Sequence, residues 1–362
     1  MTEKRARTGY PSLVVAICGF VALGGLIAVL SAWSFVGQRL KESRDAALAE
    51  AVSVRARGVG LDFARELHQD WRNLRLVAVE MTGRGEPAVR TALDLIVAEK
   101  ERISWAGLAS VDGKVLTASS GMLEGADVSS RPWFTNGLGG DFAGDVHPAV
   151  LLAELLPPIG NEPRRFLDMA TPVTDEFGSV EGVLAFHINH HWVEQYLTET
   201  AHSMGLDVYV IDRTGNIVAR TDGLSERIDK LQSFRSAMTG ARQTGVEKWP
   251  DGATYFTTVI PVLGYADLPA FGWSMIARIN NTAHPIGEFT SLFIVYFVTL
   301  GIVLAALTAL FILIFVRPFR KLAKTARAVM RGEDIYPYEA RTTAEASVLS
   351  AAVARLQNKM QP

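Results

Sequence analysis

Two stretches decide the fold: LVVAICGFVALGGLIAVLSAWSFV (residues 13–36) and FTSLFIVYFVTLGIVLAALTALFILIFV (residues 289–316). Neither contains a charged residue. A helix of about 20 apolar residues crosses the hydrocarbon core of a bilayer, and both runs reach that length. Each is predicted to be a transmembrane helix, because backbone hydrogen bonds must be closed internally in lipid. The first run is longer than the apolar part of a cleaved signal peptide, so we expect it to be retained.

Basic residues before the first run and after the second run predict the membrane topology. Lys4, Arg5 and Arg7 precede the first run. A larger basic group follows the second run: Arg317, Arg320, Lys321, Lys324 and Arg327. Positively charged flanks stay in the cytoplasm. We therefore expect a multi-pass protein of the bacterial inner membrane, in contact with lipid, with residues 1–12 inside and residues 37–288 outside.

Composition narrows the possible functions. The 362 residues are enough for two or three domains. The formal net charge of -2 lacks the basic excess of a nucleic-acid-binding protein, so no nucleic-acid partner is expected. Cys18 is the only cysteine, which excludes an intrachain disulfide and any zinc site built on two or more cysteines.

The exported segment begins with a helical pattern. Apolar residues recur at spacings of three and four within residues 37–82, which places them on one stripe of a helix. The stripe consists of Phe63, Leu67, Trp71, Leu74, Val77 and Met81. A long helix with one apolar seam is suited to be the spine of a domain and a dimer stalk.

A hairpin unit then occurs twice. Residues 104–117 and 206–219 each read as a β-rich run, a turn led by aspartate and containing glycine, and a second β-rich run. A second pair of hairpins follows at residues 165–188 and 255–279. Internal repetition sets the architecture. We predict an α+β fold in which two tandem antiparallel-sheet modules are attached to one long helix.

The two predicted modules differ in their middle parts. The first, about residues 83–190, has a long insert at 119–164 that is rich in Trp, Phe, Asp, His and Pro. The second, about residues 191–288, has a shorter and more ordinary middle. A binding pocket is therefore expected in the first module, which we place farther from the membrane.

Three short motifs in this region resemble the double Cache family of bacterial extracytoplasmic sensor domains. They are Arg131-Pro132-Trp133-Phe134, Gly144-Asp145-Val146-His147 and Arg165-Phe166-Leu167-Asp168-Met169-Ala170. The resemblance covers roughly residues 37–288. It implies two PAS-like modules, a small-molecule ligand in the membrane-distal one, and a pocket made of a helix, a loop and a strand.

The chemistry of the same residues supports a binding site. Arg131 offers a forked donor to a carboxylate or carbonyl. Aromatic side chains supply flat apolar walls. Aspartates and a histidine supply polar partners, and side chains two apart on the strand share one face. The predicted ligand-binding residues are Arg131, Trp133, Phe134, Asp145, His147 and Asp168.

The ligand class and some roles stay open at this level. In relatives that recognise amino acids, tyrosines stand at the positions of Ala126 and Phe134, so an amine, a purine-like heterocycle and an amino acid are all compatible with the sequence. Trp133 and Phe134 could also be ordinary core residues. Arg131 could bridge to a surface acid, and the aspartates could cap turns or pair with the neighbouring arginines 164 and 165.

The sequence gives little support for a metal site or for an enzymatic function. His187, His190 and His191 form a tempting group, but the first ends a predicted strand and no acidic partner follows at ligand spacing, so we expect no metal and no cofactor. The sequence lacks the nucleophile elbow, the phosphate-binding loop and the HExxH motif. We therefore expect no catalytic domain in this chain.

The C-terminal residues 317–362 resemble a HAMP domain. Pro318 follows the membrane, two short amphipathic stretches are joined by a connector, and Glu345 opens the second stretch. The resemblance implies a homodimer. No kinase, cyclase or chemotaxis signalling segment is recognisable, so we expect output to be supplied elsewhere. The predicted function is receptor input; the alternatives are a membrane-anchored periplasmic protein-interaction module and a tethered exported enzyme.

Overall fold

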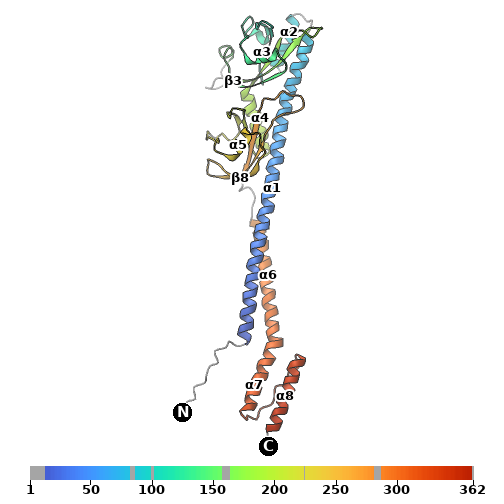
Figure 1. Cartoon of the computed structure of the whole chain (residues 1–362), viewed down its shortest axis with the longest axis vertical. Coiled ribbons are helices and arrows are strands. Elements are labelled where there is room, and N and C mark those ends of the chain that lie inside the picture. The colour runs from blue at the N-terminus through green and yellow to red at the C-terminus, as the bar shows by residue number, and fades with distance from the viewer. Residues whose placement is uncertain are drawn as a thin grey trace. The chain divides into compact units, whose positions relative to one another are not determined.

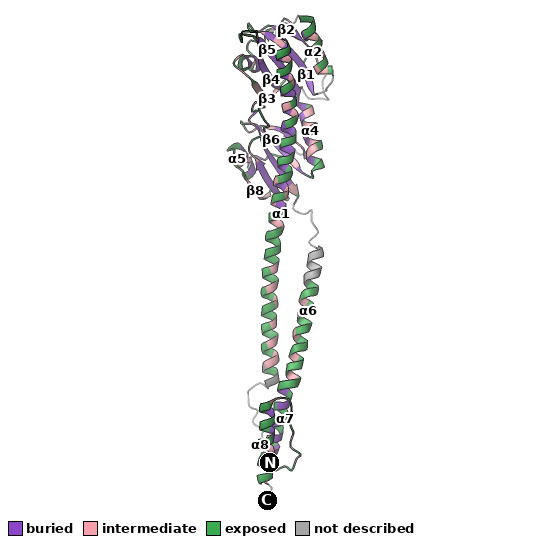
Figure 2. Cartoon of the chain, turned by 90° about the vertical axis from the view of Figure 1, so that its right-hand side faces the viewer, coloured by how far each residue is buried: buried purple, intermediate pink, exposed green. Residues whose placement is uncertain are grey.

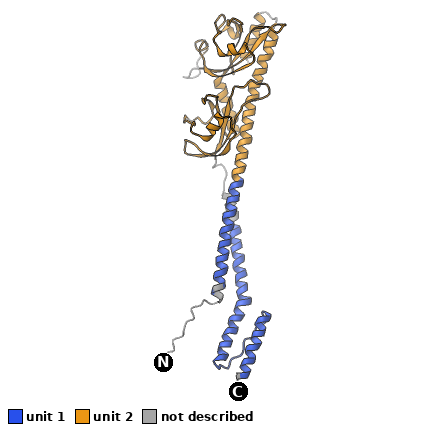
Figure 3. Cartoon of the chain, in the orientation of Figure 1, with its two compact units in different colours: residues 1–43, 284–362 blue, residues 44–283 orange. Residues whose placement is uncertain are grey.

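The computed structural model describes residues 13–81, 86–98, 102–156, 164–223, 225–280 and 287–360. The chain divides into two compact units (Figure 3). We call Arg44–Ala283 the two-sheet unit, and Met1–Ser43 with His284–Pro362 the helical unit. Lys4, Arg5 and Arg7, which contribute to the predicted topology, lie outside the described residues.

The helical unit holds the two predicted membrane spans. It contains the start of α1 (Leu13–Met81) and all of α6 (Gly287–Phe311), which a π-helical turn at Ile312–Val316 joins to the next helix. Two helices are long and apolar enough to cross a membrane, one within Ile17–Met81 and one within Ile294–Met330. Their apolar side chains are mostly exposed (Figure 2). Exposed apolar surface of this extent requires lipid rather than water, so the chain is membrane-anchored.

The helical unit ends in two amphipathic helices, α7 (Arg317–Met330) and α8 (Ala344–Met360). Leu322 of α7 is buried with Ala340 and Ala346. The connector is held by Ser350, whose hydroxyl donates to the Tyr338 carbonyl at 2.6 Å. The two helices and the connector that the sequence indicated are present, and their assignment as a HAMP domain stays a prediction.

The described residues of the two-sheet unit form ten strands in two five-stranded antiparallel sheets (Figure 1). The first module comprises β1 (Ile103–Ser110), β2 (Val115–Ala118), β3 (Phe142–Pro148), β4 (Arg165–Thr174) and β5 (Val180–Asn189). The second comprises β6 (Asp207–Ile211), β7 (Ile217–Arg220), β8 (Thr244–Lys248), β9 (Thr254–Ile260) and β10 (Ser274–Asn280). Besides the part of α1 from Arg44 onward, the described helices of this unit are α2 (Glu86–Ala98), α3 (Pro132–Gly137), α4 (His190–Ser203) and α5 (Gln232–Met238), with a 3-10 turn at Ser119–Gly121.

The sheet topology confirms the predicted repeat. The first sheet has the strand order β2-β1-β5-β4-β3, and the second has the equivalent order β7-β6-β10-β9-β8. The first hairpin of each module turns at a glycine with positive φ, Gly113 at 82° and Gly215 at 91°. Residues with a Cβ rarely adopt this conformation, which explains the glycine in both turns. The predicted α+β class and the two antiparallel modules on a long helix are therefore confirmed.

One apolar seam of α1 lies under both sheets. Phe63, Trp71 and Leu74 are fully buried, and Leu67 and Met81 are nearly so. These residues belong to one core with the inward side chains of both modules. The stripe predicted from the sequence is thus the surface on which both sheets are assembled, and its burial is the main apolar contribution to this unit.

A buried ion pair fixes the first module to α1. Arg102, just before β1, is 7% exposed and donates to the fully buried Asp70 of α1 through Nε at 2.9 Å. Its Nη1 also donates to Glu66 at 2.7 Å, and its guanidinium lies over the Trp192 ring at 4.9 Å. The charge is paired and its donors are used, which is the condition under which a buried arginine is tolerated.

Two leucines on α1 provide a matched test of this packing. Leu74 is fully buried and Leu76 is 57% exposed. Leu74→Ala is expected to lower the free energy of unfolding by about 2–5 kcal/mol because it leaves a cavity in the shared core. Leu76→Ala is expected to change it by less than about 0.5 kcal/mol. Urea unfolding of the full-length protein in nanodiscs, followed by tryptophan fluorescence, measures both; equal losses would contradict the assigned seam.

Candidate functional site

The candidate site lies on the face of the first sheet that points away from α1. Side chains alternate along β4, so Leu167 and Met169 join the α1 core while Phe166, Asp168 and Ala170 face the other way. A cavity of about 430 Å³ opens on this second face. It is lined by residues of α3, β3, β4 and β5 and by the segment that follows β3. The cavity is in the first module, where the insert at 119–164 led us to expect a binding pocket.

Helix α3 brings the arginine and tryptophan to the cavity. Pro132 occupies the first turn of the helix, where its missing N–H and fixed φ cost least. Arg131 is the N-cap residue and lines the cavity, with no ion pair to any described residue. Trp133 also lines the cavity, although its side chain is almost entirely buried. Phe134 is buried behind it, edge-on to the Trp133 ring, and supports the wall rather than forming it.

The Gly144–His147 segment is part of strand β3, whereas the sequence resemblance implied a loop. Gly144 pairs with Asp168 and His147 pairs with Phe166, so β3 has one residue more than β4 between these points. Such a bulge changes the direction of side chains. The His147 ring reaches Asp168, while the Asp145 carboxylate accepts a hydrogen bond from the Trp273 indole of the second module at 2.8 Å.

Asp168 lies between two histidines. Its Oδ2 contacts Nε2 of His147 at 2.9 Å, and its Oδ1 is 2.6 Å from Nδ1 of His187. The second contact has the distance of an ion pair but not the angle of a hydrogen bond. Asp168 is 2% exposed, so its charge would be costly without these partners. The sequence alternatives for Asp168, a turn cap or a pair with a neighbouring arginine, are not what the structure has.

His187 is enclosed by aromatic rings. Its imidazole stacks on Trp105 with centroids 4.7 Å apart and on Phe166 at 5.7 Å. Trp133 meets the same ring edge-on at 5.9 Å. These contacts hold the orientation of the imidazole, because aromatic pairs at such distances have preferred geometries. The floor of the cavity is therefore rigid.

The electrostatics of this group favour a charged pair. Burial opposes ionisation of Asp168, but the charge of His187 and the hydrogen bond from His147 outweigh it and lower the Asp168 pKa to about 2. Burial also lowers the His147 pKa, yet the hydrogen bond and charge of Asp168 outweigh it and raise that pKa above its ordinary value. The nearby Arg131 charge opposes this rise.

Five of the six predicted site residues line this cavity, namely Arg131, Trp133, Asp145, His147 and Asp168. Their role in binding remains a prediction. Sequence reasoning missed His187 and Trp105, which also line the cavity. The sequence indicated the β4–β5 hairpin, but counting back from the turn at Asp175–Gly178 places Ala185 opposite Asp168. A longer turn and the bulge between Val173 and Thr174 shift the register, so that His187 is the partner.

The other two histidines of the sequence group are elsewhere. His190 begins α4, and its Nε2 contacts the Val218 carbonyl of the second module. His191 donates its backbone N–H to the Asn189 side chain, which caps the same helix. Among the described residues, no group of three metal-ligating side chains has the geometry of a metal site.

No protein-family model and no curated protein matches this chain. Solved structures do match. They are extracellular ligand-binding domains of receptors. The ligand-binding domain of the Pseudomonas fluorescens chemoreceptor CtaA, in complex with L-alanine, is 16% identical with a TM-score of 0.46, covering 66% of this chain and 97% of that one. The ligand-binding domain of the Pseudomonas aeruginosa chemoreceptor PctB, in complex with L-Arg, is 14% identical with a TM-score of 0.47, covering 68% and 92%.

An extracellular ligand-binding receptor from Desulfohalobium retbaense is 13% identical to this chain with a TM-score of 0.46. The match covers 61% of this chain and only 39% of the Desulfohalobium chain.

The Asp168 carboxylate should control the titration of His147. In the native protein the His147 pKa is expected above 6.5, its ordinary value. Asp168→Asn removes the charge that raises it and leaves burial, so the His147 pKa should fall below that value. NMR titration of the His147 ring measures it. Asp141→Asn is the control, because Asp141 bonds to Thr171 instead; an unchanged His147 pKa in Asp168→Asn would contradict the pairing.

Proposed function

We propose that the chain is a transmembrane receptor whose first module binds a small carboxylate-bearing molecule outside the cytoplasm. The observation that carries this proposal is the charge pattern of the cavity. Arg131 lines it with no ionic partner among the described residues. The carboxylate of Asp168 is already paired with two histidines. The Asp145 carboxylate, which also lines the cavity, accepts a hydrogen bond from the Trp273 indole. Among the described residues, Arg131 is therefore the cation that can pair with a ligand, and a carboxylate is the group that an arginine fork binds best.

The same pattern argues against a simple amine. A cationic ligand would meet the Arg131 charge, and of the two carboxylates in the lining it would find Asp168 paired with two histidines and Asp145 accepting from the Trp273 indole. A carboxylate group meets no such cost, and the rest of the ligand can lie against Trp105 and Trp133. Among the classes that the sequence left open, an amino acid carries the carboxylate that this geometry favours. The ligand body must be small, since the cavity measures about 430 Å³.

Arginine substitutions test this site. A thermal-shift panel of small carboxylates, with matched amines and purines, is measured on the full-length protein in nanodiscs. Arg131→Ala is expected to weaken binding of the best carboxylate about 10–100-fold, because a charged hydrogen bond contributes about 1.5–3 kcal/mol. Titration calorimetry gives the affinity.

Arg165→Ala is the matched control. Arg165 begins β4, pairs with Glu194 of α4 at 3.5 Å and does not line the cavity. Its loss is expected to leave the affinity unchanged. An equal loss in both variants would contradict the assignment of Arg131. A panel without any hit, combined with tight binding of a periplasmic protein, would favour the protein-interaction alternative.

Signal transfer is proposed to start at the bulge of β3. His147 contacts Asp168 inside the cavity, and Asp145, two residues earlier, bonds to Trp273. The Trp273 ring is stacked with Phe63 of α1, with ring centroids 6.3 Å apart. A ligand that repositions the bulge therefore acts on the second module and on α1 through one contiguous set of contacts. Transmission requires the ligand to bind two states of this set with different affinity.

Removal of the hydrogen bond from the Trp273 indole to Asp145 should abolish the signalling response while ligand binding is kept. In a proposed homodimer, Val303→Cys on α6 in a Cys18→Ser background is cross-linked in native membranes with and without ligand. Trp273→Phe keeps an aromatic ring but removes the hydrogen bond to Asp145. We expect the ligand-induced change in cross-linking to be largely lost, while affinity changes by less than about tenfold.

Trp249→Phe is the control for this experiment. The Trp249 indole donates to Thr257 within the second module, so its loss removes a similar bond that has no link to the cavity. The ligand response of this variant should persist. A Trp273→Phe protein that responds like the native one would refute this route, and the absence of any cross-link between copies would argue against the homodimer.

A further inference from the structure

The second module has a polar centre at the position that corresponds to the ligand cavity of the first. The β5 and β10 strands end with similar sequences, Phe186-His187-Ile188-Asn189 and Ala277-Arg278-Ile279-Asn280. Both strands are the third in the order of their sheets. His187 and Arg278 therefore occupy equivalent positions, each on the face that points away from α1.

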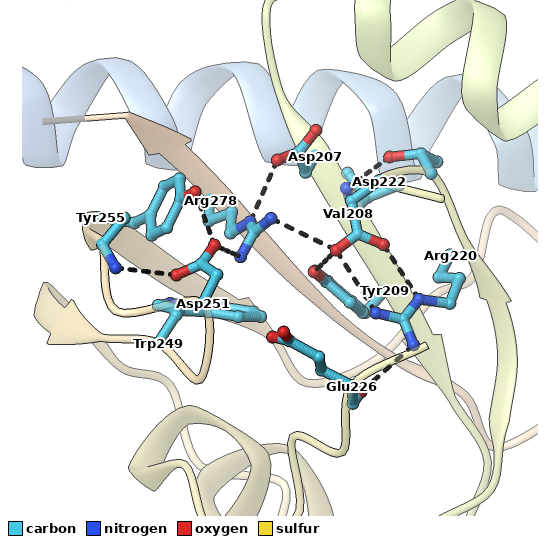
Figure 4. A network of polar contacts seen from close by, with 12 residues as sticks. Asp207, Val208, Tyr209, Arg220, Asp222, Glu226, Trp249, Asp251, Tyr255 and Arg278 are labelled. Carbon is cyan, nitrogen blue, oxygen red and sulfur yellow. Dashed lines mark hydrogen bonds and ion pairs between the residues drawn. The ribbon is translucent and has the colours of Figure 1, made fainter. Parts of the chain in front are cut away.

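The Arg278 side chain is buried and contacts polar groups on several sides, as a bound ligand does in its site. Its side chain is 3% exposed, and its guanidinium donates to three carboxylates (Figure 4). Nε bonds to Asp207 at 3.0 Å, Nη2 to Asp222 at 3.2 Å and Nη1 to Asp251 at 3.3 Å. The N–H groups at the edge of the planar guanidinium thus donate to acids from three different segments of the chain.

Aromatic rings cover the faces of the same guanidinium. Its carbon lies 4.1 Å from the Tyr255 ring centroid and 4.3 Å from that of Trp249. Tyr209 is 5.6 Å away on β6. Flat cations are attracted to aromatic faces, most strongly where water is excluded. Acids around the edge and rings over the faces are the arrangement that recognises a free guanidinium compound.

Two of the three acids of this cage have partners other than Arg278. Asp222 also accepts from Arg220 Nε at 2.9 Å and from the Tyr209 hydroxyl. Asp251 accepts from the Tyr255 hydroxyl at 2.8 Å. The three carboxylates face two arginines, so removal of Arg278 leaves a preorganised cage with unmatched negative charge (Figure 4).

We propose that Arg278 is a built-in ligand: the second module is a binding module for a guanidinium group, and its site is occupied by the chain's own side chain. The first module has an open cavity at the equivalent place and keeps the external ligand. The comparison between modules rests on the proposed function of the first. It follows that the second module is held in its occupied form at all times, and that ligand response is confined to the first.

Chemical rescue tests the cage directly. Full-length Arg278→Ala in nanodiscs is expected to have a lower Tm than the native protein, because three carboxylates, of which Asp222 has a buried side chain, lose this partner. Methylguanidinium chloride in the millimolar range should raise that Tm saturably and recover most of the loss. Methylammonium at the same concentration should recover little, because it lacks the planar fork.

The native protein and Arg213→Ala, an exposed arginine of the same module, are the controls and should show no such rise. Equal responses in all three proteins, or equal rescue by methylammonium, would overturn the proposal. If Arg278→Ala does not fold, Arg278→Lys decides: it keeps the charge but not the shape, so a Tm equal to the native value would also overturn it. No first-module ligand is needed, so either proposal can fail while the other stands.

Discussion

The packing of both sheets on one seam of α1 is the constraint on which the two-sheet unit depends. Phe63, Trp71 and Leu74 have no exposed surface, and they join the inward faces of both modules in a single core. Because one face of each sheet is used in this way, only the opposite face is available for a site. The buried pair of Arg102 and Asp70 adds a polar anchor of the first module to the same helix.

The repeated fold places two different chemistries on equivalent faces. In the first module a histidine with an aspartate partner lies at the base of an open cavity. In the second, an arginine fills the equivalent place and is enclosed by acids and aromatic rings. The backbone arrangement is common to both, whereas the side chains on one strand position decide whether space remains for a ligand.

The contact between Asp145 and Trp273 gives the two modules a direct polar connection. A bulge in β3 makes it possible, because it lets neighbouring residues serve different partners. The indole that donates this hydrogen bond is stacked with Phe271 and Phe63, so a shift of the bulge is opposed by close-packed rings. Close packing transmits displacement rather than absorbing it, which is why this path suits a receptor.

Local patterns in the sequence determined the elements of this protein. The apolar runs at 13–36 and 289–316 are long and uncharged, the stripe on α1 has helical period, and the hairpin turns have their aspartates and glycines. Each signal depends only on residues near one another in the chain, so the two modules and most of the cavity residues were predictable. The strands β3 and β8 lie at the edges of their sheets, in the middle parts of the two modules, and they were not predicted.

Tertiary structure decided which groups meet. Asp168 and His187 are 19 residues apart in numbering and pair through strand register, whereas Asp145 and Trp273 are separated by 128 positions and meet only where the modules touch. Phe134 looked like a pocket wall, but helix geometry turned it into the core behind Trp133. Long-range contacts of this kind depend on how folded elements pack, and no local pattern carries that information.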